Sequence, residues 1–474
     1  MKASMKSTQI IILGGTGDLS KRKLIPALLD LFARGMLPET FQIIGQARSQ
    51  WGSVEYQEFV KKALQEHHSQ HEHSKEVLED FCSRLAYVQG SFDDITSYDR
   101  LKDSLKEFDT TNGVKSNRLF YLAVPPKFYK DIFSDLKSTG TAHEQEDTWT
   151  HILVEKPFGN DLKTAQELDA LLASLYREDQ IFRIDHYLAK EAVQNILSFR
   201  FANTLLMAPW SNESVESVSI KMLETIDVGS RAGFYEGVGA LRDVGQNHLL
   251  QLVALVAMQQ PESFSAEEIR TKRAEVFSAL KPLDLDTIEK SVLRAQYEGY
   301  KTNDAIPDDS HTETYFELKA ELTLPQWQSV PFYIQAGKAL NHEEVSITIT
   351  FKDVASGLFE TKSCLSVGNQ IILTISPEQT IAITLNAKSP GLGYQLESRT
   401  LSIPCADKKP NEIQNSYEKV LFDSISGDHT LFTLTEEVLA AWKFITPILD
   451  AWHSLPLHTY KKNSSGPEKT ILKE

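Results

Sequence analysis

The sequence predicts two domains: an α/β domain with a parallel sheet at the N-terminus, and a larger α+β domain with a mostly antiparallel sheet after it. The chain has 474 residues, which is more than one hydrophobic core usually organises. In its first part, β-rich apolar runs alternate with helical stretches, whereas later strand-like runs cluster at hairpin-like spacings. We expect the first domain to span residues 1–185 and the second to span residues 186–474.

The elements of the first domain follow from the spacing of its apolar residues. A β-rich run at 9–13 ends in a glycine turn, and apolar residues at helical spacing follow at 24–32. Further strands are expected at 41–45, 118–124 and 151–155, with long helical stretches between them. This alternation is typical of a parallel sheet covered by helices, the Rossmann-like arrangement.

The second domain is expected to begin with helices, and most of its strands come late. Helical spacing covers residues 190–201 and 238–258. β-rich runs predict strands at 216–223, 312–323, 345–351, 370–375 and 380–385. The last stretch, 461–474, is rich in Lys, Ser and Gly, and we expect it to be frayed.

Composition excludes several classes of protein. With 41% hydrophobic and 24% charged residues, the chain is expected to fold as a soluble protein. A formal net charge of −16 argues against general nucleic-acid binding, so an anionic substrate would need a local basic pocket. No segment reaches the roughly 20 apolar residues that span a bilayer, so we expect no membrane association.

Three cysteines, Cys82, Cys364 and Cys405, lie far apart without CxxC spacing. This spacing indicates neither a disulfide framework nor a zinc site. We therefore expect free thiols, a cytoplasmic location and no metal.

The glycine turn after the first strand is a candidate phosphate-binding loop. Its spacing, Gly14-x-x-Gly17-x-x-Ser20, varies the usual G-x-G-x-x-G pattern and leads into a helix. Backbone N–H groups in such a turn approach a dinucleotide pyrophosphate, and the helix N-terminus favours its negative charge. An ordinary strand-to-helix turn is the alternative. The residues expected to contact the cofactor are Gly14, Gly15, Thr16, Gly17, Asp18 and Leu19.

The second strand ends in Gly45-Gln46-Ala47-Arg48, without the acidic residue that binds a ribose 2′-hydroxyl. An arginine here can pair with a 2′-phosphate, which favours NADP as the cofactor, with NAD as a weaker alternative. A solvated surface arginine is the other interpretation of Arg48.

Two polar clusters carry the candidate chemistry. Residues 183–191, RIDHYLAKE, bring a carboxylate, an imidazole, a phenol and an ammonium group to a strand end and helix start, types that suit an anion such as phosphate. Residues 242–251, RDVGQNHLLQ, lie in a helical stretch in which Asp243 and His248 are five residues apart, and so are offset around an α-helix. Histidine is the natural base near neutral pH, because its unperturbed pKa is about 6.5. Packing or solvated side chains are the alternatives, and zinc is not expected, since this second cluster lacks a cysteine or a second histidine.

These motifs resemble those of the glucose-6-phosphate dehydrogenase family over nearly the whole chain. The shared blocks are GGTGDLSKRKLIPAL, GQARS, EKPFG, RIDHYLAKE, RDVGQNHLLQ, GDHTLF and AAWKFITPILDAW. RIDHYL followed by RDxxQNHLLQ, in this order, is a highly specific pair.

The resemblance implies oxidation of glucose 6-phosphate to 6-phosphogluconolactone with hydride transfer to NADP, the entry step of the pentose phosphate and Entner–Doudoroff pathways. It implies His248 as the catalytic base with Asp185 as its partner, and Arg48 at the 2′-phosphate. The substrate-binding positions that it implies are Lys156, which also lies by the cofactor, His186, Tyr187, Lys190, Glu224, Asp243 and Lys338. Self-association as a dimer or tetramer is also expected.

Three residues near Lys338 depart from the family pattern. Gln335 stands where a cation is usual, and Glu343 and Glu344 stand where basic residues are often found. We expect these changes to make the anion-binding side of the pocket less positive and to raise KM for the substrate. The alternatives are a related NAD(P)-dependent sugar or sugar-phosphate dehydrogenase with an altered pocket, and a catalytically weak regulatory homologue.

Overall fold

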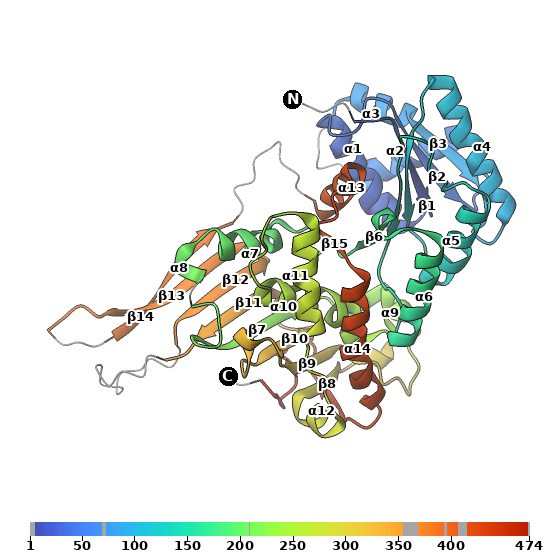
Figure 1. The fold of residues 1–474 in the computed structure, drawn as a ribbon. Helices are drawn as coiled ribbons and strands as arrows, with labels where there is room; N and C mark the ends of the chain where they lie inside the picture. Colours follow the sequence, from blue (N-terminus) through green and yellow to red (C-terminus); the bar gives the residue numbers. More distant parts are fainter. Residues whose placement is uncertain are drawn as a thin grey trace.

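Two sheets, each with its own helices, organise the molecule (Figure 1). The computed structural model describes residues 5–68, 73–207, 209–353, 368–392, 396–405 and 415–472. Cys364 lies outside the described residues, while Cys82 and Cys405 are free thiols.

The first sheet has the strand order β15-β6-β5-β4-β1-β2-β3. All its strands are parallel except β15, which pairs antiparallel with β6. Their bounds are β1 Thr8–Leu13, β2 Phe41–Ala47, β3 Leu85–Gln89, β4 Asn117–Leu122, β5 Thr150–Val154, β6 Ile181–Ile184 and β15 Phe432–Thr433. The order reverses at β1, since β2 lies on one side of it and β4 on the other. Ligands of open parallel sheets bind at such a switch point.

Helices cover both faces of this sheet. Alternate residues of β1 enter two different cores, because successive side chains of a strand point to opposite faces. Ile10 and Ile12 pack with α1 Ile25–Ala33, α2 Ser53–His67 and α3 Lys75–Ser83. Ile11 and Leu13 pack with α4 Ile95–Asn112, α5 Tyr129–Ser138 and α6 Leu162–Leu175. The sheet is therefore doubly wound, as the alternation of strands and helices predicts.

The second sheet has the order β14-β13-β12-β11-β7-β10-β9-β8-β16. It is antiparallel except for the pairs β7–β10 and β8–β16. The strands are β7 Val215–Leu223, β8 Val292–Tyr297, β9 Tyr315–Ala320, β10 Phe332–Gly337, β11 Glu344–Phe351, β12 Gln370–Ser376, β13 Thr380–Lys388, β14 Leu396–Pro404 and β16 Leu457–Tyr460. Along β12, buried residues alternate with half-buried ones, so one face packs on the core.

The helices of the second part pack mainly against this sheet and against each other. They are α7 Glu191–Phe201, α8 Thr204–Met207, α9 Ala232–Tyr235, α10 Leu250–Ala257, α11 Ala266–Ser278, α12 Leu285–Ser291, α13 Ser416–Ser426 and α14 Thr435–Ala451. A π-helical segment, η5 Leu241–Leu249, leads directly into α10, which is buried on all sides. A second π-helical turn, η1 Ser20–Leu24, precedes α1, and single 3₁₀ turns are η2 Pro126–Phe128, η3 Glu178–Gln180, η4 Gly229–Arg231, η6 Tyr300–Thr302 and η7 Pro325–Trp327.

The C-terminal part of the chain ties the two sheets together. α13 packs against α1, β15 joins the first sheet beside β6, and α14 packs against both α6 and α11 (Figure 1). The two parts of the chain therefore meet near the end of β6, where the RIDHYLAKE motif begins.

The expected fold class is confirmed, and each strand expected from the sequence has a counterpart in one of the two sheets. The prediction of a frayed tail is wrong for residues 461–472. Asn341 N donates to Ser464 O at 2.9 Å, and Ile471 N donates to the buried Glu317 Oε2 at 2.8 Å. Among the described residues, no helix is long and apolar enough to cross a membrane.

Candidate active site

The glycine loop after β1 packs too closely on its neighbours to carry side chains. Gly14 has φ +90°, and a Cβ atom there would lie 2.4 Å from Ala123 O. A Cβ on Gly15 would lie 2.6 Å from Gly45 Cα in β2. Glycine is required at both positions, because the loop runs between β2 and the end of β4 with its backbone against both. The loop thus occupies the switch point of the sheet.

The rest of the loop leads into a helix and suits a pyrophosphate. Gly17 N donates to Gly14 O at 2.8 Å, which closes the turn, and the helix follows at once. Thr16 and Leu19 are half-buried, while Asp18 is exposed and forms an ion pair with Arg22 at 2.9 Å. A glycine cradle at a helix N-terminus offers backbone N–H groups and a favourable dipole to an anion. The residues present therefore fit a dinucleotide phosphate group.

Arg48 is exposed immediately after β2. The turn that carries it is fixed by Tyr87, whose hydroxyl donates to Ala47 O at 2.8 Å and to Ser49 O at 2.9 Å. The backbone at Arg48 is therefore held in place, while its guanidinium is accessible to a ligand next to the glycine loop.

A buried histidine–aspartate pair lies where the two parts of the chain meet. Asp185 directly follows β6, and His248 lies in η5. His248 Nδ1 lies 2.6 Å from Asp185 Oδ1, and both residues are buried. Asp185 Oδ1 also accepts the backbone N–H of Tyr187 at 3.0 Å, which fixes the carboxylate. The structure thus brings together two residues that are 63 positions apart in the sequence.

The charges of this pair follow from burial and mutual attraction. Burial lowers the pKa of His248, and attraction to Asp185 offsets part of that effect. Burial acts to raise the pKa of Asp185, but attraction to His248 and the hydrogen bond with it outweigh burial and hold that pKa well below its usual value. His248 is therefore neutral at neutral pH, with Nδ1–H donating to an ionised Asp185. This tautomer leaves a lone pair on Nε2, which is the form a general base needs.

Lys156, just after β5, lies on the Nε2 side of His248. Its Nζ is 2.9 Å from His248 Nε2 and donates to Asp243 O at 2.7 Å. The carboxylate of Asp243 lies 3.7 Å from the same ammonium. Asp243 and His248, which an α-helix would offset, thus meet one lysine because η5 is π-helical, with wider turns than an α-helix.

The aromatic and basic residues after Asp185 surround His248. The Tyr187 ring stacks on the His248 ring at 4.3 Å, and the His186 ring meets His248 edge-on at 4.7 Å. Lys190 Nζ lies 3.8 Å from the centre of the Tyr187 ring. Burial, with a smaller contribution from His248, lowers the pKa of His186 to about 3, so this imidazole is neutral and can offer an N–H donor. Burial also lowers the pKa of Lys190.

Beyond Asp243, the group of charged side chains continues with Lys338 and Glu224. Lys338 Nζ lies 2.5 Å from Glu224 Oε2 and 3.9 Å from Asp243 Oδ2. Glu224 follows β7 and Lys338 follows β10, and these strands are paired in parallel, so both side chains come from the same end of the sheet. All the residues expected at the catalytic and substrate positions therefore form one connected group.

The three departures from the family pattern lie in different places. Gln335 Nε2 donates to the Tyr315 hydroxyl at 2.5 Å, and that hydroxyl donates to Glu317, beside the C-terminal segment. Its amide is thus engaged away from Lys338 and Lys190, which does not support the expected role at the anion-binding side. Glu343, in contrast, acts electrostatically on both Lys190 and Tyr187. Glu344 contacts Lys221, at 3.8 Å.

The sequence did not reveal a buried ion pair that lies next to the helical segment carrying His248. Arg273 of α11 lies 3.1 Å from Glu437 of α14, and both side chains are almost fully buried. Gln251, three residues after His248, donates to Glu437 at 2.8 Å. The AAWKFITPILDAW block begins in the same helix as Glu437. This block was the sequence signal that could have pointed to the ion pair.

A doubly wound sheet with a glycine loop at its switch point, next to a buried histidine–aspartate pair, is the arrangement of a dehydrogenase that uses a nicotinamide dinucleotide. The family model described as glucose-6-phosphate dehydrogenase, NAD binding domain, matches residues 11–195, and the model for the C-terminal domain of that enzyme matches residues 197–472. The chain belongs to the glucose-6-phosphate dehydrogenase family.

Individual relatives agree with this assignment. The glucose-6-phosphate 1-dehydrogenases of Chlamydia pneumoniae and Rhizobium meliloti are 36% and 37% identical to this chain, covering 97% of it and 93% and 94% of their own lengths. A solved structure of glucose-6-phosphate dehydrogenase in complex with glucose 6-phosphate superposes with a TM-score of 0.90 at 35% identity, covering 99% of this chain and 97% of the other. The enzyme from Mycobacterium avium gives a TM-score of 0.84 at 32% identity, covering 98% and 96%.

Proposed function

We propose that this chain oxidises glucose 6-phosphate to 6-phosphogluconolactone with NADP as the hydride acceptor, and that His248 is the general base. The observation that carries the proposal is the 2.6 Å contact between His248 Nδ1 and Asp185, which fixes the ring with its Nε2 lone pair directed at the Lys156 ammonium. Family membership supports the same substrate, since a related structure of similar fold contains glucose 6-phosphate.

The cofactor would be held by the loop Gly14, Gly15, Thr16, Gly17, Asp18 and Leu19 and by Arg48 and Lys156. The close packing of Gly14 and Gly15 supports a pyrophosphate at the loop. The exposed guanidinium of Arg48 supports a 2′-phosphate, and therefore NADP ahead of NAD. When bound, the nicotinamide supplies the hydride acceptor.

His186, Tyr187 and Lys190 would bind the substrate phosphate. Two of the three offer uncharged donors, since His186 is neutral and Tyr187 carries a hydroxyl. Glu224 and Asp243 would accept hydrogen bonds from sugar hydroxyls, and the Lys338 ammonium lies between them, 2.5 Å from Glu224 and 3.9 Å from Asp243. A carboxylate pair of this kind distinguishes a polyhydroxylated substrate from a simple phosphate ester.

The chain's own residues remove the proton from the substrate. The anomeric hydroxyl gives its proton to His248 Nε2 as the C1 hydride leaves, and the carbonyl of the lactone forms. Lys156 must move away from Nε2 to admit the hydroxyl, and its ammonium can then stabilise the oxygen as the proton departs. Asp185 stabilises the imidazolium that results, as the carboxylate does in hydrolase triads. Base assistance of this kind typically contributes 10²–10⁴-fold to the rate.

We also propose that the cofactor domain comprises residues 1–185, that residues 186–474 form the substrate and assembly domain, and that the chain self-associates as a dimer or tetramer. Exposed apolar side chains on the outer strands of the second sheet support an assembly surface: Leu385 of β13, and Leu401 and Ile403 of β14. The buried free thiol of Cys82 suits a reducing cytoplasm.

The second candidate is a related sugar dehydrogenase with an altered pocket, which the electrostatic influence of Glu343 on Lys190 favours. Absorbance at 340 nm separates the two, with glucose 6-phosphate or free glucose as substrate and NADP or NAD as cofactor. We expect fastest reduction with glucose 6-phosphate and NADP. Preference for free glucose would establish the second candidate, and no reduction with any pair would establish a catalytically weak homologue.

A further inference from the structure

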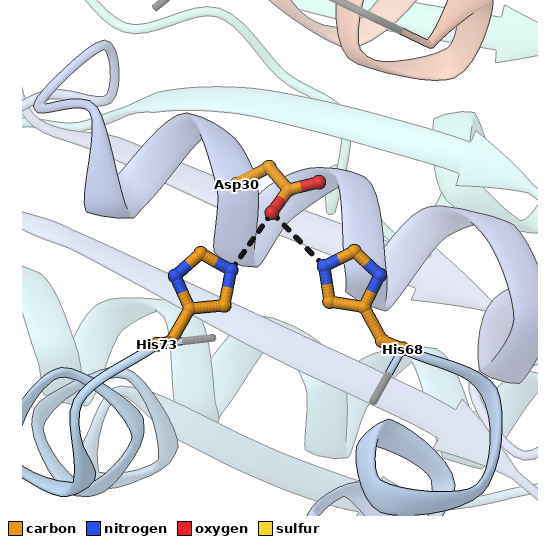
Figure 2. Close-up of side chains that lie close together, drawn as sticks. All are labelled: Asp30, His68 and His73. Atoms are coloured by element: carbon orange, nitrogen blue, oxygen red, sulfur yellow. Dashed lines mark hydrogen bonds and ion pairs between the residues drawn. The ribbon is translucent and has the colours of Figure 1, made fainter. Parts of the chain in front are cut away.

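Two histidines and an aspartate converge on one another in the first domain, away from the site described above. Figure 2 shows Asp30 on α1 with the rings of His68 and His73 directed at its carboxylate. Each Nε2 atom lies 2.9 Å from Asp30 Oδ1. One potential ligand atom from each residue lies within 4.8 Å of the other two.

The setting of Asp30 is unusual for a carboxylate. It is one of the buried residues of the apolar helix α1, IPALLDLFA, and only 3% of its surface is exposed. The side chains of His68 and His73 are 11% and 16% exposed. Buried carboxylates are retained where they are paired or coordinate a metal. Asp30 is therefore placed by the fold so that two imidazoles can share it.

We propose that Asp30, His68 and His73 bind a divalent transition-metal ion, with Zn²⁺ as the preferred ion. Imidazole and carboxylate are zinc ligands, at about 2.0–2.2 Å from the metal. Tetrahedral coordination at those lengths places ligand atoms about 3.3 Å apart, which requires only small side-chain shifts from the 2.9 Å contacts. The metal displaces any proton on each Nε2 to solvent, and water completes the coordination.

The surroundings permit an ion to enter and remain. A cavity of about 860 Å³ that is lined by His68 and His73 opens beside them, which gives access from solvent. Two lysines line the same cavity, yet each faces a carboxylate: Lys61 Nζ is 2.6 Å from Glu58, and Lys75 Nζ is 3.5 Å from Glu79. The sequence adds a separate signal, since residues 67–73 read HHSQHEH, and short histidine-rich tracts are typical of metal binding.

The site would be structural. His68 directly follows α2, His73 directly precedes Ser74, which caps α3, and Asp30 lies near the end of α1. A bound ion would fasten three helices to one another on the outer side of the first sheet. Asp30 lies ten residues beyond the start of η1, about 15 Å along the helix axis from the glycine loop. We therefore expect metal to raise stability and to leave turnover unchanged.

The test uses the full chain, free of any affinity tag and treated with a chelator that is then removed. Titration with Zn²⁺ should show one ion per chain with Kd below about 1 µM, and a melting temperature raised by at least about 2 °C at saturation. His73→Gln and Asp30→Asn should each weaken binding at least tenfold. His67→Asn is the matched control, because His67 lies in the same tract outside the cluster and should bind as wild type does.

A Kd for Zn²⁺ above about 10 µM in the wild-type chain would overturn the proposal. Equal losses of Zn²⁺ affinity in His67→Asn and His73→Gln would overturn it too, since the histidine tract would then bind the ion without the Asp30 cluster. If Asp30→Asn fails to fold, His68→Gln replaces it. Turnover with glucose 6-phosphate is measured on the same samples, and its absence would bear only on the proposed function.

Discussion

Replacing Asp185 with asparagine isolates the charge that supports His248, the proposed general base. The substitution keeps the shape of the side chain and removes the negative charge 2.6 Å from His248 Nδ1. Hydrogen bonds to charged groups contribute about 1.5–3 kcal/mol, and each 1.36 kcal/mol is tenfold in rate. The imidazolium that forms in the transition state loses this stabilisation, so we expect kcat to fall by between about tenfold and about a hundredfold.

The pH profile gives a second readout that a merely structural role would not move. His248 must be neutral to act, so kcat/KM is retained above its pKa and lost as the pH falls through it. Asp185 raises the pKa of His248 against the effect of burial, so its removal lowers that pKa further. The acid limb of the Asp185→Asn profile should therefore move to lower pH. Asp308→Asn, an exposed substitution of the same kind, is the control. An unchanged kcat, or an acid limb moved to higher pH, would refute the reasoning.

Three further outcomes are expected. Arg48→Ala should raise KM for NADP by about tenfold or more and leave KM for NAD nearly unchanged, since a charge-assisted contact is lost; equal losses with both cofactors would reject the 2′-phosphate assignment. Glu343→Gln should lower KM for glucose 6-phosphate by up to about fivefold at low salt, because Glu343 acts on Lys190, and leave KM for glucose unchanged; an unaltered KM for the phosphorylated sugar would contradict this. Arg273→Met should lower the melting temperature strongly, because it leaves the buried carboxylate of Glu437 without its cation, at a cost of about 3–5 kcal/mol. If chemical denaturation showed the free energy of unfolding falling by less than about 1 kcal/mol, the ion pair would be dispensable.

The parts of the fold that the sequence predicts are those with strong local patterns. β1 is an unbroken apolar run closed by glycines, and β12 and β13 are β-rich runs joined by a short turn. β15 could not be found in this way, because two residues carry no periodicity and their pairing with β6 joins positions about 250 residues apart along the chain. β14 was also missed, since most of its residues are polar and its apolar alternation is limited to Leu401 and Ile403.

The candidate site, like the fold, is predicted from the sequence only where its signals are local. The residue types of RIDHYLAKE and RDVGQNHLLQ point to an anion site and a base, but no local pattern pairs Asp185 with His248; that partnership comes from the family resemblance. The π-helical turn of η5, which brings Asp243 and His248 to Lys156, has no clear sequence signature. The Asp30 cluster was overlooked, although the HHSQHEH tract was its visible signal, because the aspartate that completes it lies in a distant helix.

The most direct test of the proposed chemistry is turnover by His248→Asn with glucose 6-phosphate and NADP, measured beside the Kd for the sugar phosphate. A general base acts mainly in the transition state, so kcat should fall by about 10²–10⁴-fold while Kd stays within a few-fold of wild type. If His248→Asn retained near wild-type kcat, His248 would not be the base, and the proposed mechanism would be wrong.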